Sequence, residues 1–400
     1  MKAHLLRIQI LIFFLVVSIS HLFSLDLNFK YYMVENGLSS NTVYTIIQDS
    51  KGFIWIGTED GLNRFDGYTF HSYRNIPRDE TSIVNNYVYA LYEDVDNRLW
   101  VGTETGISIY DRKSNSFHFF DKKTKENITL SDKIQNIVSD EDENLWISSF
   151  RQGVFFYDRT RDILKIYSFD KFIQNKQEPI YITCIYRDRD GTLWALANNT
   201  KYQMYKYDSN KDEFVPAFPK ASAEMLGKLG GYSLLEDTFG TLWLGTWTNG
   251  LLEINKKEGV KQAYLNTENG DKILHIHSIM EYEPGKLLIG SNDGLTSFNV
   301  SSVIGNRKDS HIKEPVLSNR FVYPIFKDRE GGLWIGTYYG GINYASPNRN
   351  YFTSYTHDRY ENSLSGSVVS TFCEDNSGNL WIGTDDGGLN YFNSYFSFTP

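Results

Sequence analysis

One short phrase recurs along the chain and constrains its fold more than any other feature. Each copy places a tryptophan within a run of apolar residues, in most copies followed by glycine and threonine. The tryptophans are Trp55, Trp100, Trp146, Trp194, Trp243, Trp334 and Trp381, and Leu288 of KLLIGSNDGL takes the same place in the remaining copy. Successive copies are 45 to 49 residues apart. A catalytic motif normally occurs once, whereas this period is typical of a four-stranded propeller blade, so the sequence predicts an all-β propeller.

Each repeat also predicts its own hairpin. A run of β-branched and aromatic residues, such as 43–49 (VYTIIQD), precedes the tryptophan and ends in an aspartate six positions before it. Its carboxylate is expected to accept hydrogen bonds from backbone N–H groups of the turn. A glycine three positions before the tryptophan supplies the positive φ of the turn, with Asn97 as a tolerated substitute and Glu143 as the exception.

The tryptophan strand is expected to be covered on both faces by adjacent sheets. Its apolar neighbours would then fill the space between blades, which cannot bury their faces alone. The glycine two positions after the tryptophan, as at Gly57 and Gly336, is expected where blades approach closely near the axis.

The start of the chain predicts how the ring closes. Phe29–Tyr32 resembles a fourth strand, and the following ENGLSSNTV matches ENSLSGSVV at 361–369. If this strand completes the blade around Trp334, residues 25–346 form a seven-bladed β-propeller of four-stranded blades closed by an N-terminal outer strand. Residues 347–400 are then the first blade of a second, truncated β-propeller. If it completes the blade around Trp381, the chain is one eight-bladed propeller. Pro347 in the connection favours the first arrangement.

Residues 1–24 have the layout of a secretory signal peptide. Lys2 and Arg7 precede the apolar run 10–17, and small serines follow near a cleavage site. No later apolar run approaches the ~20 residues of a membrane span. We therefore expect an exported, periplasmic protein that meets the membrane only through the signal segment or a missing C-terminal part.

Bulk composition excludes several classes. The net charge of −9 argues against nucleic acid as a partner. Cys184 and Cys373 lie in apolar strand-like runs far apart in the chain, so buried thiols are expected and a disulfide framework is excluded.

The pattern D-x-x-G-x-L-W-I-G-T-x-x-G-L, its period, the exported N-terminus and the opening ENGLSSNTVYTIIQDSKGFIWIGTEDGLNRFDG resemble the two-component regulator propellers. These form the periplasmic sensor region of hybrid two-component sensor histidine kinases of Bacteroidetes. The resemblance covers about residues 28–393. It implies a ligand-sensing region, in many members for oligosaccharides, that signals through a homodimer to a kinase across the membrane. The kinase would belong to a longer parent polypeptide, so no enzymatic activity is expected in these residues.

Candidate chemistry in the sequence is sparse. Acidic runs such as 94–100 (DVDNRLW) resemble fragments of calcium loops, but each leads directly into a strand and is interpreted as a hairpin turn. His275 and His277 share a strand face without a third ligand, so no metal or cofactor is expected. The turns also resemble those of sialidase-like propellers, which keeps a glycan-active enzyme open as an alternative, as is a plain protein-interaction scaffold.

Binding residues are predicted in the loops that follow the tryptophan strands, because these loops gather on one face around the axis. Most are short and acidic, as at Glu59 and Asp60. Three loops depart from this habit and supply the predicted ligand-binding residues Phe150, Arg151, Trp247, Tyr338 and Tyr339. Aromatic side chains there can stack on sugar rings, and arginine can bind hydroxyl or acidic groups. Alternatively, these residues plug the axis or pack against the next propeller.

Overall fold

The computed structural model describes residues 29–219, 230–264, 274–300, 317–347, 357, 363–392 and 398–399. The signal segment predicted at 1–24 lies outside these residues. The described chain is built of β-strands, with two short 3₁₀ turns at Val34–Asn36 and Asp170–Phe172. No helix among the described residues is long and apolar enough to cross a membrane. The prediction of an all-β propeller fold is confirmed.

Five consecutive antiparallel sheets each take four strands that follow one another along the chain. They are β2 (Val43–Gln48), β3 (Ile54–Thr58), β4 (Gly61–Phe65) and β5 (Phe70–Tyr73); β6 (Val88–Glu93), β7 (Leu99–Thr103), β8 (Gly106–Asp111) and β9 (Ser116–Phe119); β10 (Ile134–Ser139), β11 (Leu145–Ser149), β12 (Gly153–Asp158) and β13 (Ile163–Tyr167); β14 (Tyr181–Arg187), β15 (Leu193–Asn198), β16 (Met204–Asp208) and β17 (Glu213–Pro216); and β18 (Gly231–Glu236), β19 (Leu242–Thr246), β20 (Leu251–Asn255) and β21 (Gly259–Tyr264). A sixth sheet has three strands in the described chain: β22 (Ile276–Glu283), β23 (Lys286–Ser291) and β24 (Gly294–Asn299).

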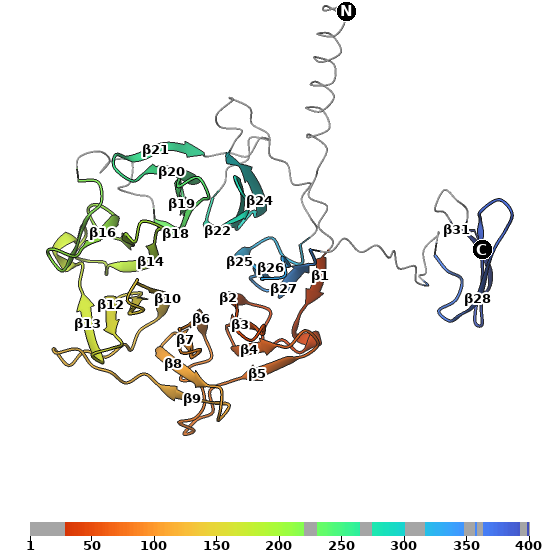
Figure 1. The fold of residues 1–400 in the computed structure, drawn as a ribbon, viewed down its shortest axis with the longest axis horizontal. Coiled ribbons are helices and arrows are strands. Elements are labelled where there is room, and N and C mark those ends of the chain that lie inside the picture. The colour runs from red at the N-terminus through yellow and green to blue at the C-terminus, as the bar shows by residue number, and fades with distance from the viewer. Residues whose placement is uncertain are drawn as a thin grey trace, which may run out of the picture. The chain divides into compact units, whose positions relative to one another are not determined.

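The seventh sheet joins the two ends of the ring. It contains β25 (Val322–Lys327), β26 (Leu333–Thr337) and β27 (Ile342–Ala345), and its outer strand is β1 (Phe29–Tyr32). β1 runs antiparallel to β27, with Phe29 opposite Ala345 and Tyr32 opposite Ile342. The first strands of the seven sheets, β2, β6, β10, β14, β18, β22 and β25, contact one another in order, and β25 contacts β2 (Figure 1). We call these the inner strands. The N-terminal strand β1 and the last three strands of the first unit therefore share one sheet, which closes the ring.

The chain divides into two compact units, residues 1–347 and 348–400. The second unit contains its own sheet of β28 (Val369–Glu374), β29 (Leu380–Thr384), β30 (Gly388–Phe392) and β31 (Phe398–Thr399). In this sheet β30 pairs with β31, and β1 makes no pair with it among the described strands.

An aspartate and a tryptophan clamp the hairpin in six of the seven sheets of the first unit. One carboxylate oxygen of Asp49 accepts hydrogen bonds from the backbone N–H groups of Lys51 and Phe53, as the sequence predicts. The other oxygen accepts a 2.7 Å bond from Trp55 Nε1, which the sequence did not predict. The indole bond recurs in five further sheets of the first unit at 2.8–3.1 Å. The repeat thus encodes a turn and an anchored core side chain together.

Backbone geometry at the turn agrees with the prediction. Gly52 has φ of 96°, and the equivalent glycines of the other hairpins are also in the left-handed region. Asn97 and Glu143 take the same conformation with φ of 60° each. Because Glu143 carries a side chain with little tolerance for this region, its hairpin stores a small local strain.

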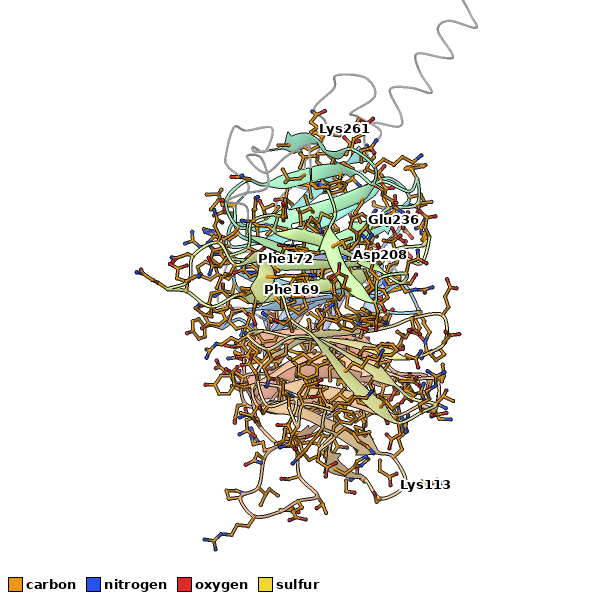
Figure 2. The ribbon with its side chains drawn as sticks, turned by 90° about the vertical axis from the view of Figure 1, so that its left-hand side faces the viewer. Lys113, Phe169, Phe172, Asp208, Glu236 and Lys261 are labelled. Atoms are coloured by element: carbon orange, nitrogen blue, oxygen red, sulfur yellow. The ribbon has the colours of Figure 1, made fainter. Side chains whose placement is uncertain are left out.

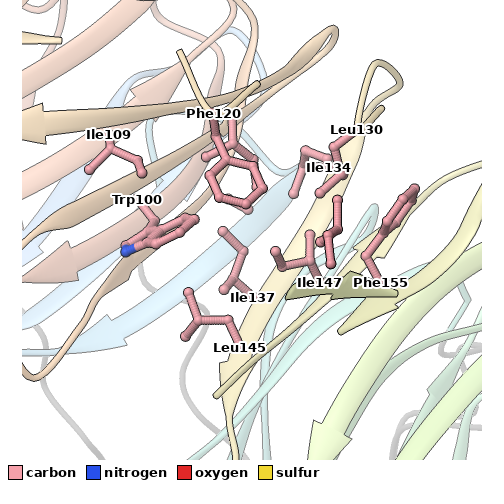
Figure 3. Packing of buried hydrophobic residues seen from close by; sticks show 12 residues of the cluster. Trp100, Ile109, Phe120, Leu130, Ile134, Ile137, Leu145, Ile147 and Phe155 are labelled. Carbon is pink, nitrogen blue, oxygen red and sulfur yellow. The ribbon is translucent and has the colours of Figure 1, made fainter. Parts of the chain in front are cut away.

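Tryptophans and aliphatic side chains fill the space between blades. Trp55, Trp100, Trp146, Trp194, Trp243 and Trp334 are all at most 4% exposed. Figure 3 shows the packing between the second and third sheets, where Trp100 and Phe120 lie beside Ile137 and Leu145. Farther from the axis, Phe169 and Phe172 both pack on Tyr205 and cover the outer part of the fourth sheet (Figure 2).

The glycine after the tryptophan marks a close approach between neighbouring blades. A methyl group at Gly57 would lie 2.7 Å from Val88 Cγ1, at the start of the next inner strand. The fourth blade reverses this arrangement, because Leu196 replaces the glycine and Gly231 replaces the next strand's branched residue. One large and one small residue therefore meet at this contact in either order.

The two cysteines differ in burial. Cys184 is buried between the fourth and fifth sheets, and burial raises the pKa of its thiol to about 12. Cys373 is exposed on β28, so the expectation that both thiols are buried is wrong for this residue. β28 has the strand pattern of a core element, but no neighbouring sheet covers Cys373 in the described chain.

Candidate functional site

Each inner strand of the first unit carries a β-bulge near its start. The pairing of β2 with β3, for example, shifts register between Val43 and Thr45. The residues skipped by the seven shifts include Tyr44, Tyr89, Gln135, Thr183, Tyr232, His277 and Tyr323. A bulge redirects a side chain away from the alternation of the strand. We call these seven positions the bulge positions.

Side chains at the bulge positions meet across different sheets. The ring centroids of Tyr44 and Tyr89 are 4.5 Å apart, and those of Tyr44 and Tyr323 are 6.1 Å apart. His277 stacks on Tyr323 with centroids 4.1 Å apart and planes inclined by 13°. These residues come from four inner strands, which lie around the centre of the ring in Figure 1, and they therefore form an aromatic layer next to its axis.

A second layer comes from the first loop residue after each tryptophan strand. The N–H group of Glu59 donates to Thr42 O, just before the inner strand of the same sheet. Glu104, Phe150, Trp247 and Tyr338 make the equivalent bond to Tyr87, Lys133, Gly230 and Phe321. This shared backbone bond fixes each of these five loop residues beside the start of the inner strand of its own blade. We call these loop residues the rim positions.

The structure brings four of the five predicted ligand residues into contact with these layers. Trp247 is 36% exposed and packs on Tyr232, with centroids 5.2 Å apart. Tyr338 stacks on Tyr323 at 5.5 Å, and the 62% exposed Tyr339 donates its hydroxyl to Tyr338 Oη at 3.2 Å.

Phe150 and Arg151 lie on the opposite part of the ring. Phe150 packs on Tyr181 with centroids 4.6 Å apart, and Lys133 Nζ lies 5.6 Å from its ring. Lys133 Nζ also lies 3.7 Å from the ring of Tyr89, so it links Phe150 to the bulge layer. Arg151 is exposed, and its backbone N–H donates to Asp132 Oδ2. The structure thus places Arg151 at the edge of the cluster without an aromatic contact of its own among the described residues.

We call the connected set the axial cluster. It comprises Tyr44, Tyr89, Lys133, Phe150, Tyr181, Tyr232, Trp247, His275, His277, Tyr323, Tyr338 and Tyr339.

Both histidines pack in this cluster. The rings of His275 and His277 lie 4.3 and 5.7 Å from that of Trp247. His275 precedes β22 with φ of 53°, so only His277 belongs to the strand. His277 Nε2 is hydrogen-bonded to Asn292 Oδ1 at 2.8 Å, and burial lowers the pKa of the imidazole. Within the described chain, no group of three His, Cys, Asp or Glu side chains is arranged to hold a metal ion.

Burial and acidic neighbours set the charge state of the cluster. Burial raises the pKa of Tyr44, and the carboxylate of Glu59 adds to the rise. Burial likewise raises the pKa of Tyr89, helped by Tyr44 and Glu104. The hydrogen bond with Tyr339 is the main reason that the pKa of Tyr338 rises to about 12. The phenols are therefore neutral donors and acceptors at physiological pH.

Sequence reasoning found the rim residues and missed the bulge residues. The rim aromatics depart from an otherwise acidic loop, so they stand out from the repeat. Tyr44, Tyr89 and Tyr323 lie within β-branched and aromatic runs, where they look like core positions. One sequence pattern could have identified them. The second residue of most inner strands is aromatic, and it lies where the alternation of inward and outward side chains along the strand is interrupted.

The repeat itself matches a known family model. Residues 37–60, 82–105, 177–199, 316–339 and 363–386 match the two component regulator propeller. The first of these segments contains both Tyr44 and Glu59, and the fourth contains both Tyr323 and Tyr338. The matched segments therefore include bulge and rim positions as well as the hairpin.

Similar proteins include one curated kinase and several solved structures. Over 55 residues, 14% of this chain and 4% of its relative, the sequence is 54% identical to histidine kinase P4 of Formosa agariphila. The extracellular domain of a hybrid two component system from B. thetaiotaomicron is 26% identical, with a TM-score of 0.66 over 93% of this chain and 48% of that one.

Virginiamycin B lyase from Staphylococcus aureus shares the fold at 13% identity, with a TM-score of 0.58 over 80% of this chain and 99% of that one. The chain spans about half the length of the B. thetaiotaomicron domain and a small part of the kinase. The repeats, their hairpin clamps and the five matched segments together show that the chain is built of two component regulator propeller repeats.

Proposed function

We propose that this chain is the extracellular ligand-sensing region of a two-component signalling protein and that the axial cluster binds an oligosaccharide. The named relatives, a histidine kinase and the extracellular domain of a hybrid two component system, support the signalling role. The observation that carries the binding role is the axial cluster, in which partly exposed aromatic rings from several blades are in contact.

The cluster has the chemistry that sugars require. Trp247 and Tyr339 present partly exposed rings that can stack on the C–H face of a pyranose. Glu59, Glu104 and Asn292 are half-buried acceptors at the rim, and the neutral phenols can donate or accept. A ligand that spans the rim would bind side chains from several blades at once.

Such contacts give a route from binding to signalling. A ligand that holds neighbouring blades together favours one arrangement of the rim over others, and this difference in affinity is the energy available for a signal. In the proposed mechanism the ligand biases the pairing of two chains in the periplasm. The rearrangement then passes across the membrane to a kinase in a longer parent polypeptide, while these residues bind and do not catalyse.

Single substitutions test the binding role. Trp247→Ala, Tyr338→Ala, Tyr339→Ala and Tyr44→Ala are each compared with wild type by titration calorimetry against a panel of neutral, amino and acidic oligosaccharides. Loss of a stacking ring is expected to weaken binding by about tenfold, which corresponds to about 1.4 kcal/mol.

Tyr68→Ala is the matched control, because Tyr68 is 92% exposed on the turn between β4 and β5. It should leave affinity unchanged. If no saccharide of the panel binds the wild-type chain, or if the four variants bind as tightly as wild type, the proposal is wrong.

A further inference from the structure

The axial cluster already holds one ammonium group, which belongs to the chain itself. Lys133 Nζ lies 3.7 Å from the centroid of Tyr89 and 5.6 Å from that of Phe150. Glu104 and Asp132 are the carboxylates that act on it, and it forms no ion pair within 4 Å among the described residues. An ammonium over a tyrosine ring with a carboxylate nearby is a recognised mode of cation binding.

The repeat places the same kinds of group beside the first blade. Tyr44 occupies the bulge position equivalent to Tyr89, and Glu59 occupies the rim position equivalent to Glu104. Tyr338 adds an aromatic rim residue from the neighbouring blade, and the charge of Glu59 acts on both Tyr44 and Tyr338. The first blade therefore repeats the tyrosine and the carboxylate that surround the Lys133 ammonium group. We call this pair of groups a cation seat.

The difference lies in the residue before the inner strand. Lys133 directly precedes β10, the inner strand of the blade after Tyr89, and the equivalent residue beside the first blade is Tyr87, which directly precedes β6. Ser40 Oγ donates to Glu59 Oε1 at 3.2 Å, and no described lysine or arginine lies within ion-pair distance of Glu59. The chain thus supplies a cation to one seat and leaves the equivalent seat with an acceptor only.

We propose that Glu59, together with Tyr44 and Tyr338, binds an ammonium group of the ligand, so that the sensed saccharide carries a free amine and no carboxylate or sulfate. This inference rests on the proposed function, since it names the ligand class of the same site. The carboxylates of Glu59, Glu104 and Asp132 outnumber the two cations Lys133 and Arg151 on this part of the rim. An anionic ligand would meet like charge there, whereas an amine gains both the carboxylate and the ring faces.

Charge-matched ligands test the seat directly. A glucosamine oligosaccharide, its N-acetylated form and a uronate oligosaccharide of the same length are titrated into the protein by calorimetry. We expect the amine form to bind at least about tenfold more tightly than the N-acetylated form, with the uronate weakest. Glu59→Gln should remove most of this preference. Glu258→Gln, an exposed carboxylate on the turn between β20 and β21, should retain it.

A simple probe separates the two proposals. A small aliphatic monoamine and its uncharged alcohol analogue are compared by thermal shift, with wild type and Glu59→Gln. Stabilisation by the amine alone, lost in the variant, supports the seat even if no saccharide binds, in which case only the oligosaccharide proposal fails. Equal affinity for amine and N-acetylated sugars, or a preference that survives Glu59→Gln, would overturn the seat and leave saccharide binding intact.

Discussion

The same five residues, LWIGT, occur in both units with different surroundings. At 333–337 all five are buried in the ring, whereas at 380–384 only Thr384 is buried and Trp381 is 39% exposed. The hairpin clamp persists in both places, with Trp334 Nε1 at 2.8 Å and Trp381 Nε1 at 3.3 Å from the aspartate. A methyl group at Gly336 would meet Val43 of another blade, while the three atoms nearest to one at Gly383 all belong to its own sheet.

This comparison separates what the repeat encodes locally from what it gains from neighbours. Turn, strand pairing and the indole hydrogen bond form within a single blade. Burial of the tryptophan and the tight contact at glycine require a second sheet on each face. The stability of a blade in this chain therefore comes largely from its position in a ring.

The two thiols should show the largest difference. At pH 8, a pKa of about 12 leaves about one Cys184 in ten thousand as thiolate, and burial blocks access as well. Cys373 is exposed, so an alkylating reagent should modify it first and almost alone. Mass spectrometry of a time course checks this order, and denaturant should make both sites react. Early modification of Cys184 would mean that the fourth and fifth sheets open readily.

Tryptophan truncation compares the units at equivalent positions. Trp334→Ala should lower the free energy of unfolding by about 3–5 kcal/mol, because it leaves a cavity between blades. Trp381→Ala should cost less than about 1.5 kcal/mol, since that side chain is partly exposed and covered on fewer sides. Urea denaturation followed by circular dichroism measures both. Similar losses in the two variants would contradict the role given to neighbouring sheets.

Ion pairs between blades are a further difference between the two units. Arg112 on the second sheet bonds Asp49 Oδ2 of the first at 2.7 Å and Glu93 at 2.6 Å, and Lys256 similarly bonds Asp188, Asp190 and Glu236. No ion pair occurs among the described residues of the second unit. Arg112→Ala leaves the fully buried Asp49 carboxylate without its cationic partner, with only the hydrogen bonds of its own hairpin, and should cost about 2–3 kcal/mol.

The exposed pair Lys165–Asp212 provides the control for this substitution. Its side chains are 46% and 55% exposed, so Lys165→Ala should cost less than about 1 kcal/mol in the same denaturation experiment. If both variants lose the same stability, the cation between blades contributes no more than a surface pair.

The smallest effect should be the same in both units. Glu143→Gly removes a side chain from the left-handed region and should raise stability by about 0.5 kcal/mol, the relief being partly offset by the entropy of glycine. Gly378→Glu makes the reverse change in the second unit and should cost a similar amount. Differential scanning calorimetry can resolve the two shifts. Markedly unequal magnitudes would show that these turns also depend on neighbouring sheets.

Features that repeat were predictable from the sequence, and features that depart from the repeat were only partly so. The aspartate turns and the β1 strand follow local patterns, because hairpin chemistry acts over a few residues. Phe150, Trp247, Tyr338 and Tyr339 were found as exceptions in their loops. Tyr44 and its equivalents were missed, because a bulge is a register shift that apolar periodicity does not reveal. The exposure of Cys373 was missed for a related reason, since strand patterns do not state whether a neighbour is present.

The pairing of β1 with β27 has a consequence for biosynthesis. Residues made first have no partner until Ala345 and its strand have been made, about three hundred residues later. The emerging chain therefore carries the unpaired strand β1 through synthesis, and the ring can close only afterwards. Chaperones would act on this last step, so the yield of folded protein should depend more on the final docking of four residues than on any single blade.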